Sequence, residues 1–412
     1  MNFYCCIGRS RLIDQNIKSN QSTRTEIFLI FLKLGCISFG GPIAHLGYFR
    51  NECVNRLKWL SDQAYADLVA LCQFLPGPAS SQVGMALGLS RGGISGAIAA
   101  WLGFTLPSAL IMILFGLVLL NVGIHDNLPW LHGLKVVAVA VVAQALWGMS
   151  STLCPDKTRA SLAVLACIGA SLIPNAIGQL VMILLGGIFG LFFLSPTKDL
   201  PTNELTFQLG KRSGIVVLVI FFIVLTLVPL LSLCVTNYPL QLFDAFYRVG
   251  SLVFGGGHVV LPLLQAKVVP TGWVDNSLFL AGYGAAQALP GPLFAFAAFL
   301  GAVSTNTPNG WLGGIIALFA IFLPSFLLII GVLPLWENLR QHLLMQKVIL
   351  GVNASVVGLL LAAFYQPVWT SAIFSMNDYL LAVLAFLLLQ FWRIQAWLVV
   401  ILCAFITGLG WH

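Results

Sequence analysis

Residues 102–122 contain no charged side chain, and this constrains the fold more than any other feature of the chain. A helix needs about 20 apolar residues to cross the hydrocarbon core of a bilayer. Only 8% of the 412 residues are charged, too few to cover a water-facing surface. The sequence therefore predicts a multi-pass membrane protein. Further stretches of this kind lie at residues 136–153, 214–233, 315–332, 348–364 and 396–410.

The predicted fold class is all-α. Residues 161–194 are apolar apart from Pro174 and Asn175 in the middle, so they predict two helices joined by a tight turn. Together with the motif segments described below, the apolar stretches predict roughly 10–13 helices or half-helices, some of them broken or re-entrant. No soluble domain is visible between them.

The chain consists of two related halves. A motif of the form basic-x-Gly-x3-Phe-Gly-Gly occurs twice, and each copy is followed by Gln-x-Leu-Pro-Gly-Pro and then by Leu-Pro-Ser. Equivalent motifs lie 214 to 217 positions apart, so the sequence indicates an internal duplication. The motifs occupy residues 33–42, 73–78 and 106–108 in the first half, and 248–257, 287–292 and 323–325 in the second.

The duplication suggests how the chain is divided. Its N-terminal tail is basic and lacks the order of regions of a signal peptide, which predicts a cytoplasmic N-terminus. The net charge of +7 is then explained by basic residues on the cytoplasmic side of the membrane, and no nucleic-acid partner is expected. The predicted segments are a basic tail at 1–24, a first repeat at 25–195, a polar linker at 196–212, a second repeat at 213–365 and C-terminal membrane helices at 366–412.

The charges around the two motifs differ. Arg50, Arg56 and Lys58 follow the first copy, whereas the equivalent stretch after the second copy carries only Lys267. Lysine and arginine concentrate on the cytoplasmic side of membrane proteins. We therefore expect inverted repeats, a common plan of secondary transporters in which the substrate site lies between the halves.

The glycine runs of the first motif are candidate substrate-binding elements. Glycines let the backbone turn through conformations closed to other residues, and proline suits the first turn of a helix. A helix that restarts there points free N–H groups and a partial positive charge at an anion. Close packing of helices through glycine is the alternative interpretation. The candidates are Gly40, Gly41 and Pro42 in the first half, and Gly255, Gly256, Gly257 and His258 in the second.

Lys33 and Arg248 occupy equivalent positions within apolar sequence. A cation at membrane depth is costly and therefore suggests a function. One cation from each half would match the charge of a dianion. The alternative is that each side chain extends along the helix to reach the lipid headgroups.

The Pro-Gly-Pro motifs predict a second pair of helix breaks. Proline removes a backbone donor and ends a helix, while glycine allows close approach of a ligand. The amide of the preceding glutamine can donate to an oxyanion. A kinked structural helix is the competing interpretation. The candidate residues are Gln73, Pro76, Gly77 and Pro78, and their equivalents Gln287, Pro290, Gly291 and Pro292.

No catalytic or metal-binding motif is recognisable. The nine cysteines are scattered without a CxxC pair, and the histidines are dispersed. We therefore expect neither an enzyme nor a cofactor or metal, and a channel remains the alternative transport class. Without an ATP site, uphill transport needs an ion gradient. The candidates for proton coupling are Glu52, Asp62, Asp67 and Asp244. Asp62 and its second-half counterpart Asp275 also suit helix caps, and Glu52 is spaced to pair with Arg56 one helical turn later.

Taken together, residues 33–42, 73–78, 248–262 and 287–292 resemble the two-domain chromate transporters of the chromate ion transporter family. The resemblance covers roughly residues 25–365 and implies a bacterial inner-membrane protein that exports chromate by proton antiport. Sulfate resembles chromate in shape and charge, so uptake of sulfate or another oxyanion is the alternative. The expected partners are chromate or sulfate, protons, the lipid bilayer and a second copy of the chain.

Overall fold

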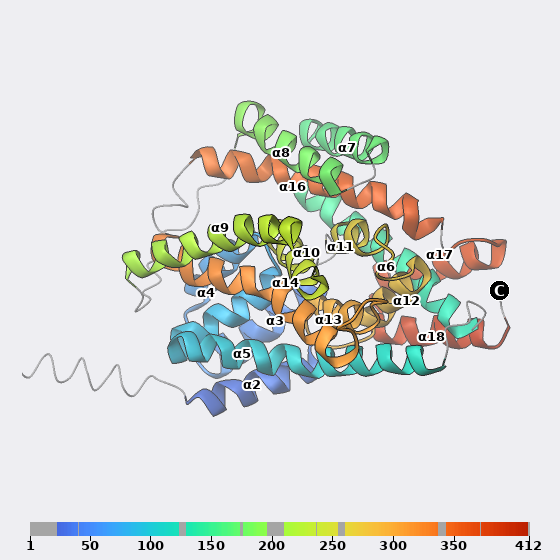
Figure 1. Cartoon of the computed structure of the whole chain (residues 1–412), viewed down its shortest axis with the longest axis horizontal. Coiled ribbons are helices and arrows are strands. Elements are labelled where there is room, and N and C mark those ends of the chain that lie inside the picture. Colours follow the sequence, from blue (N-terminus) through green and yellow to red (C-terminus); the bar gives the residue numbers. More distant parts are fainter. Residues whose placement is uncertain are drawn as a thin grey trace, which may run out of the picture.

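The computed structural model describes residues 23–39, 41–122, 129–173, 176–195, 210–235, 237–253, 260–336, 343–370 and 372–410 (Figure 1). Within these ranges there are sixteen α-helices and no strand. Five helices, namely α5, α6, α9, α14 and α16, are long and apolar enough to cross a membrane. These findings confirm the predicted all-α, multi-pass fold.

The two halves form the same series of helices. In each half a short helix ends at the first motif, a second short helix follows, and a third ends at the Pro-Gly-Pro turn before a long helix. The first series is α2 (Arg24–Ile37), α3 (Gly41–Phe49) with η1 (Arg50–Arg56), α4 (Asp62–Phe74) and α5 (Ala79–Val122). The second is α10 (Tyr238–Leu252), α11 (Val260–Val268), α12 (Asn276–Gln287), η3 (Leu293–Ala295) with α13 (Phe296–Ala302), and α14 (Gly310–Val332).

Helix α5 folds back on itself near its start. Gly92 and Gly93 leave the helical conformation, and Gly93 has a φ of +61° that favours glycine. The two arms are so close that a Cβ on Gly88 would strike the carbonyl of Gly96. A Cβ on Gly92 would lie 2.9 Å from Cδ1 of Ile27, so the first arm runs from the Pro-Gly-Pro turn to the start of α2.

Glycine also sets the packing between helices in each half. A Cβ added at Gly35 in α2 would lie 2.7 Å from the carbonyl oxygen of Phe104 in α5. The equivalent Gly250 in α10 meets the carbonyl of Ile321 in α14 in the same way. Backbones approach this closely only where no side chain intervenes. The duplicated sequence thus produces a duplicated helix contact.

The long helices of the two halves cross each other in antiparallel fashion. Trp101 of α5 packs edge-on against Phe322 and Phe326 of α14, with ring centroids 5.6 Å and 5.4 Å apart. Further along α5, Leu117 lies against Gly310 at the start of α14. Residue numbers therefore rise along one helix as they fall along the other. This crossing places the motifs of both halves in the same region.

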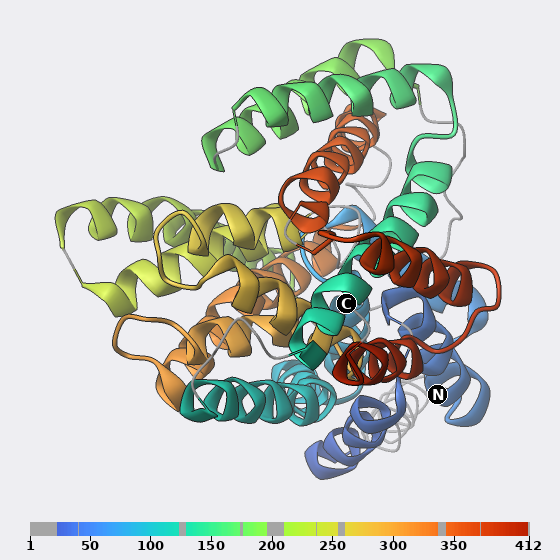
Figure 2. The same ribbon diagram turned by 90° about the vertical axis from the view of Figure 1, so that its right-hand side faces the viewer.

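Two helical hairpins pack on the opposite half of the chain (Figure 2). The α7–α8 hairpin follows α6 in sequence but packs on α16, whereas the α17–α18 hairpin follows α16 and packs on α6. Gly186 of α8 and Gly351 of α16 make one of these close contacts. The bounds are α6 (Pro129–Leu153), α7 (Lys157–Leu172), α8 (Ala176–Phe193), α9 (Lys211–Cys234), η4 (Leu333–Leu335), α16 (Leu343–Ala363), η5 (Phe364–Trp369), α17 (Met376–Gln390) and α18 (Ala396–Gly408).

Several local predictions are confirmed by these bounds. Helix α4 ends at Phe74, immediately before the Pro-Gly-Pro turn, and α3 begins with Gly41 and Pro42. Asp275 caps α12 by accepting from backbone N–H groups. The interpretation of Asp62 as a helix cap is wrong, because Ser61 caps α4 and Asp62 pairs with Arg50 instead.

Candidate functional site

The motifs of the two halves are joined by a reciprocal pair of backbone hydrogen bonds. The N–H of Gly77, in the first Pro-Gly-Pro turn, donates to the carbonyl of Val253 at the end of α10, with an N···O distance of 2.6 Å. The N–H of Gly291, in the second turn, donates to the carbonyl of Ser38 at the end of α2 at 3.0 Å. Val253 is the second-half equivalent of Ser38. Each half therefore binds a helix end of the other. We call the region around Ser38, Gly77, Val253 and Gly291 the motif crossing.

Both turns require glycine. The φ angles are +123° at Gly77 and +93° at Gly291, in the region that side-chain-bearing residues rarely adopt. A Cβ on Gly77 would lie 2.5 Å from Gln82 Nε2 and 2.6 Å from Ser325 Oγ. A Cβ on Gly291 would lie 3.0 Å from Oγ of Ser108, the first-half equivalent of Ser325. The turns thus pack against the Leu-Pro-Ser segment of the opposite half.

Polar side chains of α2, α3 and α5 are buried at the motif crossing. His45 Nδ1 lies 3.3 Å from Ser80 Oγ, and both residues are almost completely buried. The hydroxyls of Ser38 and Ser81 are buried with no hydrogen-bond partner among the described residues. Burying a hydroxyl without a partner destabilises a protein by about 1–3 kcal/mol. Such groups are therefore candidates to bind a ligand.

More polar atoms lie where α5 passes α14. Gln82 Nε2 donates to the carbonyl of Pro76 at 2.7 Å and lies 3.5 Å from Ser325 Oγ. Thr105 Oγ1 and Trp101 Nε1 are buried without a partner within the described part of the chain. Thr105 follows Phe104, whose carbonyl packs against Gly35 and Gly291. The hydroxyl and indole donors therefore belong to the same stretch of α5 as the glycine contacts.

The start of α5 adds backbone donors. The helix begins at Ala79, directly after the Pro-Gly-Pro turn, and the first backbone bond of this turn runs from the Gln82 N–H to the Pro78 carbonyl. The N–H groups of the first turn have no carbonyl within their own helix to bind. An N-terminus of this kind favours anions through its free donors and the helix dipole.

Lys33 lies away from these donors, in a surface ion-pair cluster. Its side chain is 60% exposed, and Nζ is 3.6 Å from Glu52 Oε1. Arg56 makes two hydrogen bonds to the same carboxylate at 2.6 Å and 2.9 Å. Hydrogen bonding from Arg56 lowers the pKa of Glu52, with further contributions from both cations. The predicted pairing of Glu52 with Arg56 is therefore confirmed, and Glu52 is ionised at neutral pH.

Arg248 also has a carboxylate partner. Its guanidinium donates to Asp244 one helical turn earlier in α10, and Ser232 of α9 donates to the same oxygen. The Asp244 side chain is buried, and its other oxygen has no partner among the described residues. Lys267 of α11 is close enough to interact electrostatically with both Asp244 and Arg248. This cluster, like that of Lys33, contains two cations and one carboxylate.

The other predicted site residues differ in how deeply they are buried. Gln287 is partly buried and its Nε2 has no partner in the described ranges, whereas Gln73 is exposed. Gly41 and Pro42 are partly exposed at the start of α3. Pro78, Pro290 and Pro292 are buried, and Pro76 is partly buried. Gly40, Gly255, Gly256, Gly257 and His258 lie outside the described residues.

The remaining proton-coupling candidates lie in α4. Asp62 is exposed and bound to Arg50 at 2.8 Å. The backbone of Asp67 is helical, and its side chain is not described. Among the described residues, no three His, Cys, Asp or Glu side chains are grouped so as to hold a metal ion.

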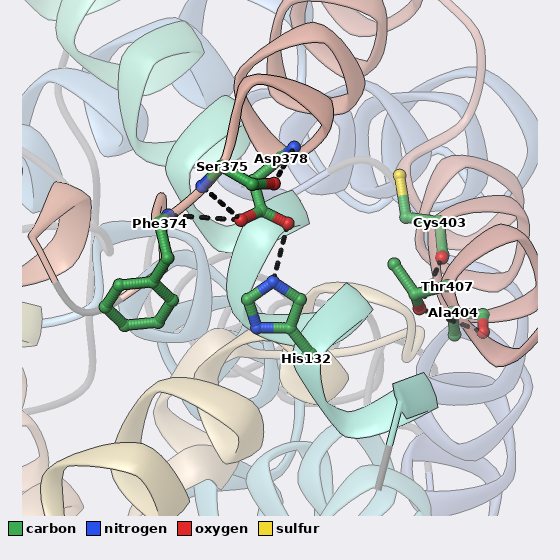
Figure 3. Close-up of polar contacts among 7 residues, drawn as sticks. All are labelled: His132, Phe374, Ser375, Asp378, Cys403, Ala404 and Thr407. Atoms are coloured by element: carbon green, nitrogen blue, oxygen red, sulfur yellow. Dashed lines mark hydrogen bonds and ion pairs between the residues drawn. The ribbon is translucent and has the colours of Figure 1, made fainter. Parts of the chain in front are cut away.

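Sequence reasoning missed several buried polar groups. Ser38, Ser81 and Thr105 lie within or beside the repeated segments, but the sequence does not show that their hydroxyls are buried without partners among the described residues. Lys135 is a buried cation in α6 that stands just before an apolar stretch. His132 of the same helix binds Asp378 of α17 at 2.7 Å, far apart in sequence but adjacent in space (Figure 3).

Comparison with known proteins adds an independent observation. The family model described as "Chromate transporter" matches the sequence twice, over residues 25–191 and 240–409. A "Probable chromate transport protein" of Synechococcus elongatus is 27% identical over 81% of each chain. The "Chromate transport protein" of Pseudomonas aeruginosa is 26% identical over 81% of this chain and 79% of its own. An uncharacterized transporter of Methanocaldococcus jannaschii is 26% identical over 85% of each chain. No solved structure matches significantly.

Proposed function

Because the chain belongs to the chromate transporter family, we propose that it is a secondary active transporter that exports chromate from the cell by proton antiport. The substrate in this proposal is the tetrahedral dianion, held at the motif crossing between the two halves. The names of the Synechococcus and Pseudomonas relatives support chromate as the substrate.

The observation that carries the proposal is the reciprocal binding of Gly77 to Val253 and of Gly291 to Ser38. These bonds gather two helix breaks from each half beside buried hydroxyls that lack partners. Hydrogen bonds to a charged acceptor are roughly twice as strong as those between neutral groups. An oxyanion at this position would satisfy several unpaired donors at once, which supports a binding site there.

We further propose that the protein lies in the bacterial inner membrane with its two halves inverted relative to each other. The helices α5 and α14 carry equivalent motifs and run antiparallel, which supports this inversion. The basic residues Arg24, Arg50 and Arg91 belong to the end of the first half where α2 begins, which supports a cytoplasmic N-terminus. The exchanged hairpins and the family match to residue 409 support a second repeat that includes α17 and α18.

Flux measurements in proteoliposomes test this function. Radiolabelled chromate is followed under pH gradients of both signs. Under antiport, chromate moves fastest from the alkaline toward the acidic compartment, and Arg248→Gln slows it because Asp244 loses its charge partner. Arg212→Gln is the control, since Arg212 is exposed at the start of α9. Chromate flux that ignores the gradient would contradict coupled transport and favour a channel.

Proton-coupled uptake of sulfate or another oxyanion is a second candidate, favoured by the Asp244–Arg248 pair. Protonation of Asp244 would leave Arg248 without its counter-charge, and anion binding would become more favourable. The proton and the anion would then move together. In the same assay, this candidate predicts fastest anion movement from the acidic toward the alkaline compartment, with sulfate carried at least as fast as chromate.

A further inference from the structure

The backbone of the motif crossing is duplicated, but most of its buried polar side chains are not. Gly77 and Gly291 make equivalent bonds, and Ser108 and Ser325 lie against them. Six buried polar residues of the first half, in contrast, have apolar residues at the equivalent described positions of the second. The pairs are Ser38 and Val253, His45 and Val260, Ser80 and Phe294, Ser81 and Ala295, Gln82 and Phe296, and Thr105 and Phe322.

The second-half residues are also buried, so their side chains form part of the molecular core. Phe294 packs against Phe322, with ring centroids 5.8 Å apart, and Phe322 packs on Trp101. Phenyl rings donate no conventional hydrogen bond. The second half therefore contributes apolar walls and backbone at these positions, while the hydroxyl donors come from the first.

Three of the first-half donors carry the inference. The hydroxyls of Ser38, Ser81 and Thr105 are each buried to 97% or more and have no partner within the described residues. Ser81 lies in the first turn of α5, beside free backbone N–H groups. The carbonyl of Ser38 accepts from Gly291, and the carbonyl of Phe104, next to Thr105, packs against Gly291, so Ser38 and Thr105 both belong to the motif crossing. Buried donors without partners are suited to a dehydrated oxyanion, whose oxygens accept several hydrogen bonds.

From this asymmetry we infer that each chain binds a single tetrahedral oxyanion, held by Ser38, Ser81 and Thr105 of the first half against the phenyl wall of the second. This inference rests on the proposed function and specifies its binding residues. The duplicated glycines give the site its shape and let the backbones approach. Most of the buried side-chain donors described at the crossing come from the first half, so two motif copies make one site.

Binding of sodium chromate and sodium sulfate to the purified full-length protein in nanodiscs tests the inference. Calorimetry should give one anion per chain for the wild type. Ser38→Ala and Thr105→Val should each weaken binding about tenfold, the effect expected for one hydrogen bond to a charged group. The matched control is Ser355→Ala, because Ser355 Oγ is also buried without a partner among the described residues but lies on α16, against α8. The affinity of the Ser355→Ala variant for both anions should equal that of the wild type.

Thermal unfolding separates binding from folding. Without anion, Thr105→Val should unfold at the same temperature as the wild type or higher, since it removes an unpaired buried hydroxyl. Chromate should raise the melting temperature of the wild type and of Ser355→Ala, and of Thr105→Val much less. Two anions per chain, or equal binding by Thr105→Val and Ser355→Ala, would overturn the inference while leaving oxyanion transport intact. Failure of the wild type to bind either anion would overturn both.

Discussion

At the scale of single residues, Gly77 and Gly291 perform the same two tasks. Each adopts a positive φ, and each donates its N–H to a helix end of the other half. Other residue types could donate the N–H, but they would be strained in the positive-φ conformation that aims it at the helix end. The sequence motif is therefore explained by backbone geometry.

Gly77→Ala tests this explanation. The new Cβ would meet Gln82 Nε2 and Ser325 Oγ at about 2.5 Å in an unfavourable backbone conformation, and we expect the unfolding free energy to fall by about 2 kcal/mol or more. Thermal unfolding in detergent measures the loss. The control is Gly148→Ala, where a Cβ meets nothing within 4 Å and helix propensity improves. Equal melting temperatures for the two variants would contradict the explanation.

Glu52 provides a second residue-scale prediction, concerning pH. Glu52 lies in η1, outside the apolar helices, and its carboxylate is shared by Lys33 and Arg56. Hydrogen bonds from Arg56 are the main cause of its lowered pKa. A lowered folded-state pKa stabilises the protein above the ordinary pKa of glutamate, and this stabilisation disappears as pH falls through the lower value. Glu52→Gln should therefore cost about 1 kcal/mol near neutral pH, because both cations are largely exposed.

The difference between Glu52→Gln and the wild type should shrink as pH is lowered from about 7 to about 3. Asp62→Asn is the control, because the Asp62–Arg50 pair is exposed on both sides and should contribute little at any pH. Melting temperatures across this range provide the measurement. A destabilisation by Glu52→Gln that stays constant with pH would show that charge pairing is not its cause.

At the scale of helices, the hairpins α7–α8 and α17–α18 are held by the opposite half. Asp378, near the start of α17, accepts from the backbone N–H groups of Phe374 and Ser375 and binds His132 of α6 (Figure 3). Asp378 is buried. Its carboxylate accepts the backbone hydrogen bonds at the start of α17 and also links α17 to α6 of the first half. The exchange of hairpins depends on such long-range contacts.

Asp378→Ala tests that link. It leaves two backbone donors and His132 without their acceptor in a buried environment, and we expect a loss of about 3 kcal/mol. Asp156→Ala is the matched control, because Asp156 also caps a helix and binds a basic residue, Arg159, but is exposed. That variant should lose about 1 kcal/mol. Hydrogen exchange should accelerate in α17 of Asp378→Ala, and unchanged exchange there would contradict the assigned role.

The helix scale also shows what sequence could predict. The end of α4 at Phe74 and the cap at Asp275 were predictable because proline and short polar side chains act on their immediate neighbours. The fold-back of α5 at Gly92 and Gly93 was not, since glycine permits such a turn without requiring it. The exchange of hairpins was also beyond prediction, because it depends on contacts between helices distant in sequence.

At the scale of the whole molecule, the repeated motifs of the two halves meet at the motif crossing. Duplication was evident in the sequence, and so were the glycine turns that form the crossing. The unpaired donors were not, because Ser38, Ser81 and Thr105 become exceptional only through burial without partners. The ion pair of Lys33 with Glu52 was likewise not evident, because it joins two different helices, whereas Asp244 and Arg248 lie four residues apart on one helix.

Binding of the oxyanion at the motif crossing can be seen directly in an electron cryomicroscopy map of the protein in nanodiscs with chromate. We expect one tetrahedral density within hydrogen-bond distance of Ser38, Ser81 and Thr105, between the turns at Gly77 and Gly291. Density bound instead in the surface cluster of Lys33, Glu52 and Arg56, with an empty motif crossing, would contradict it.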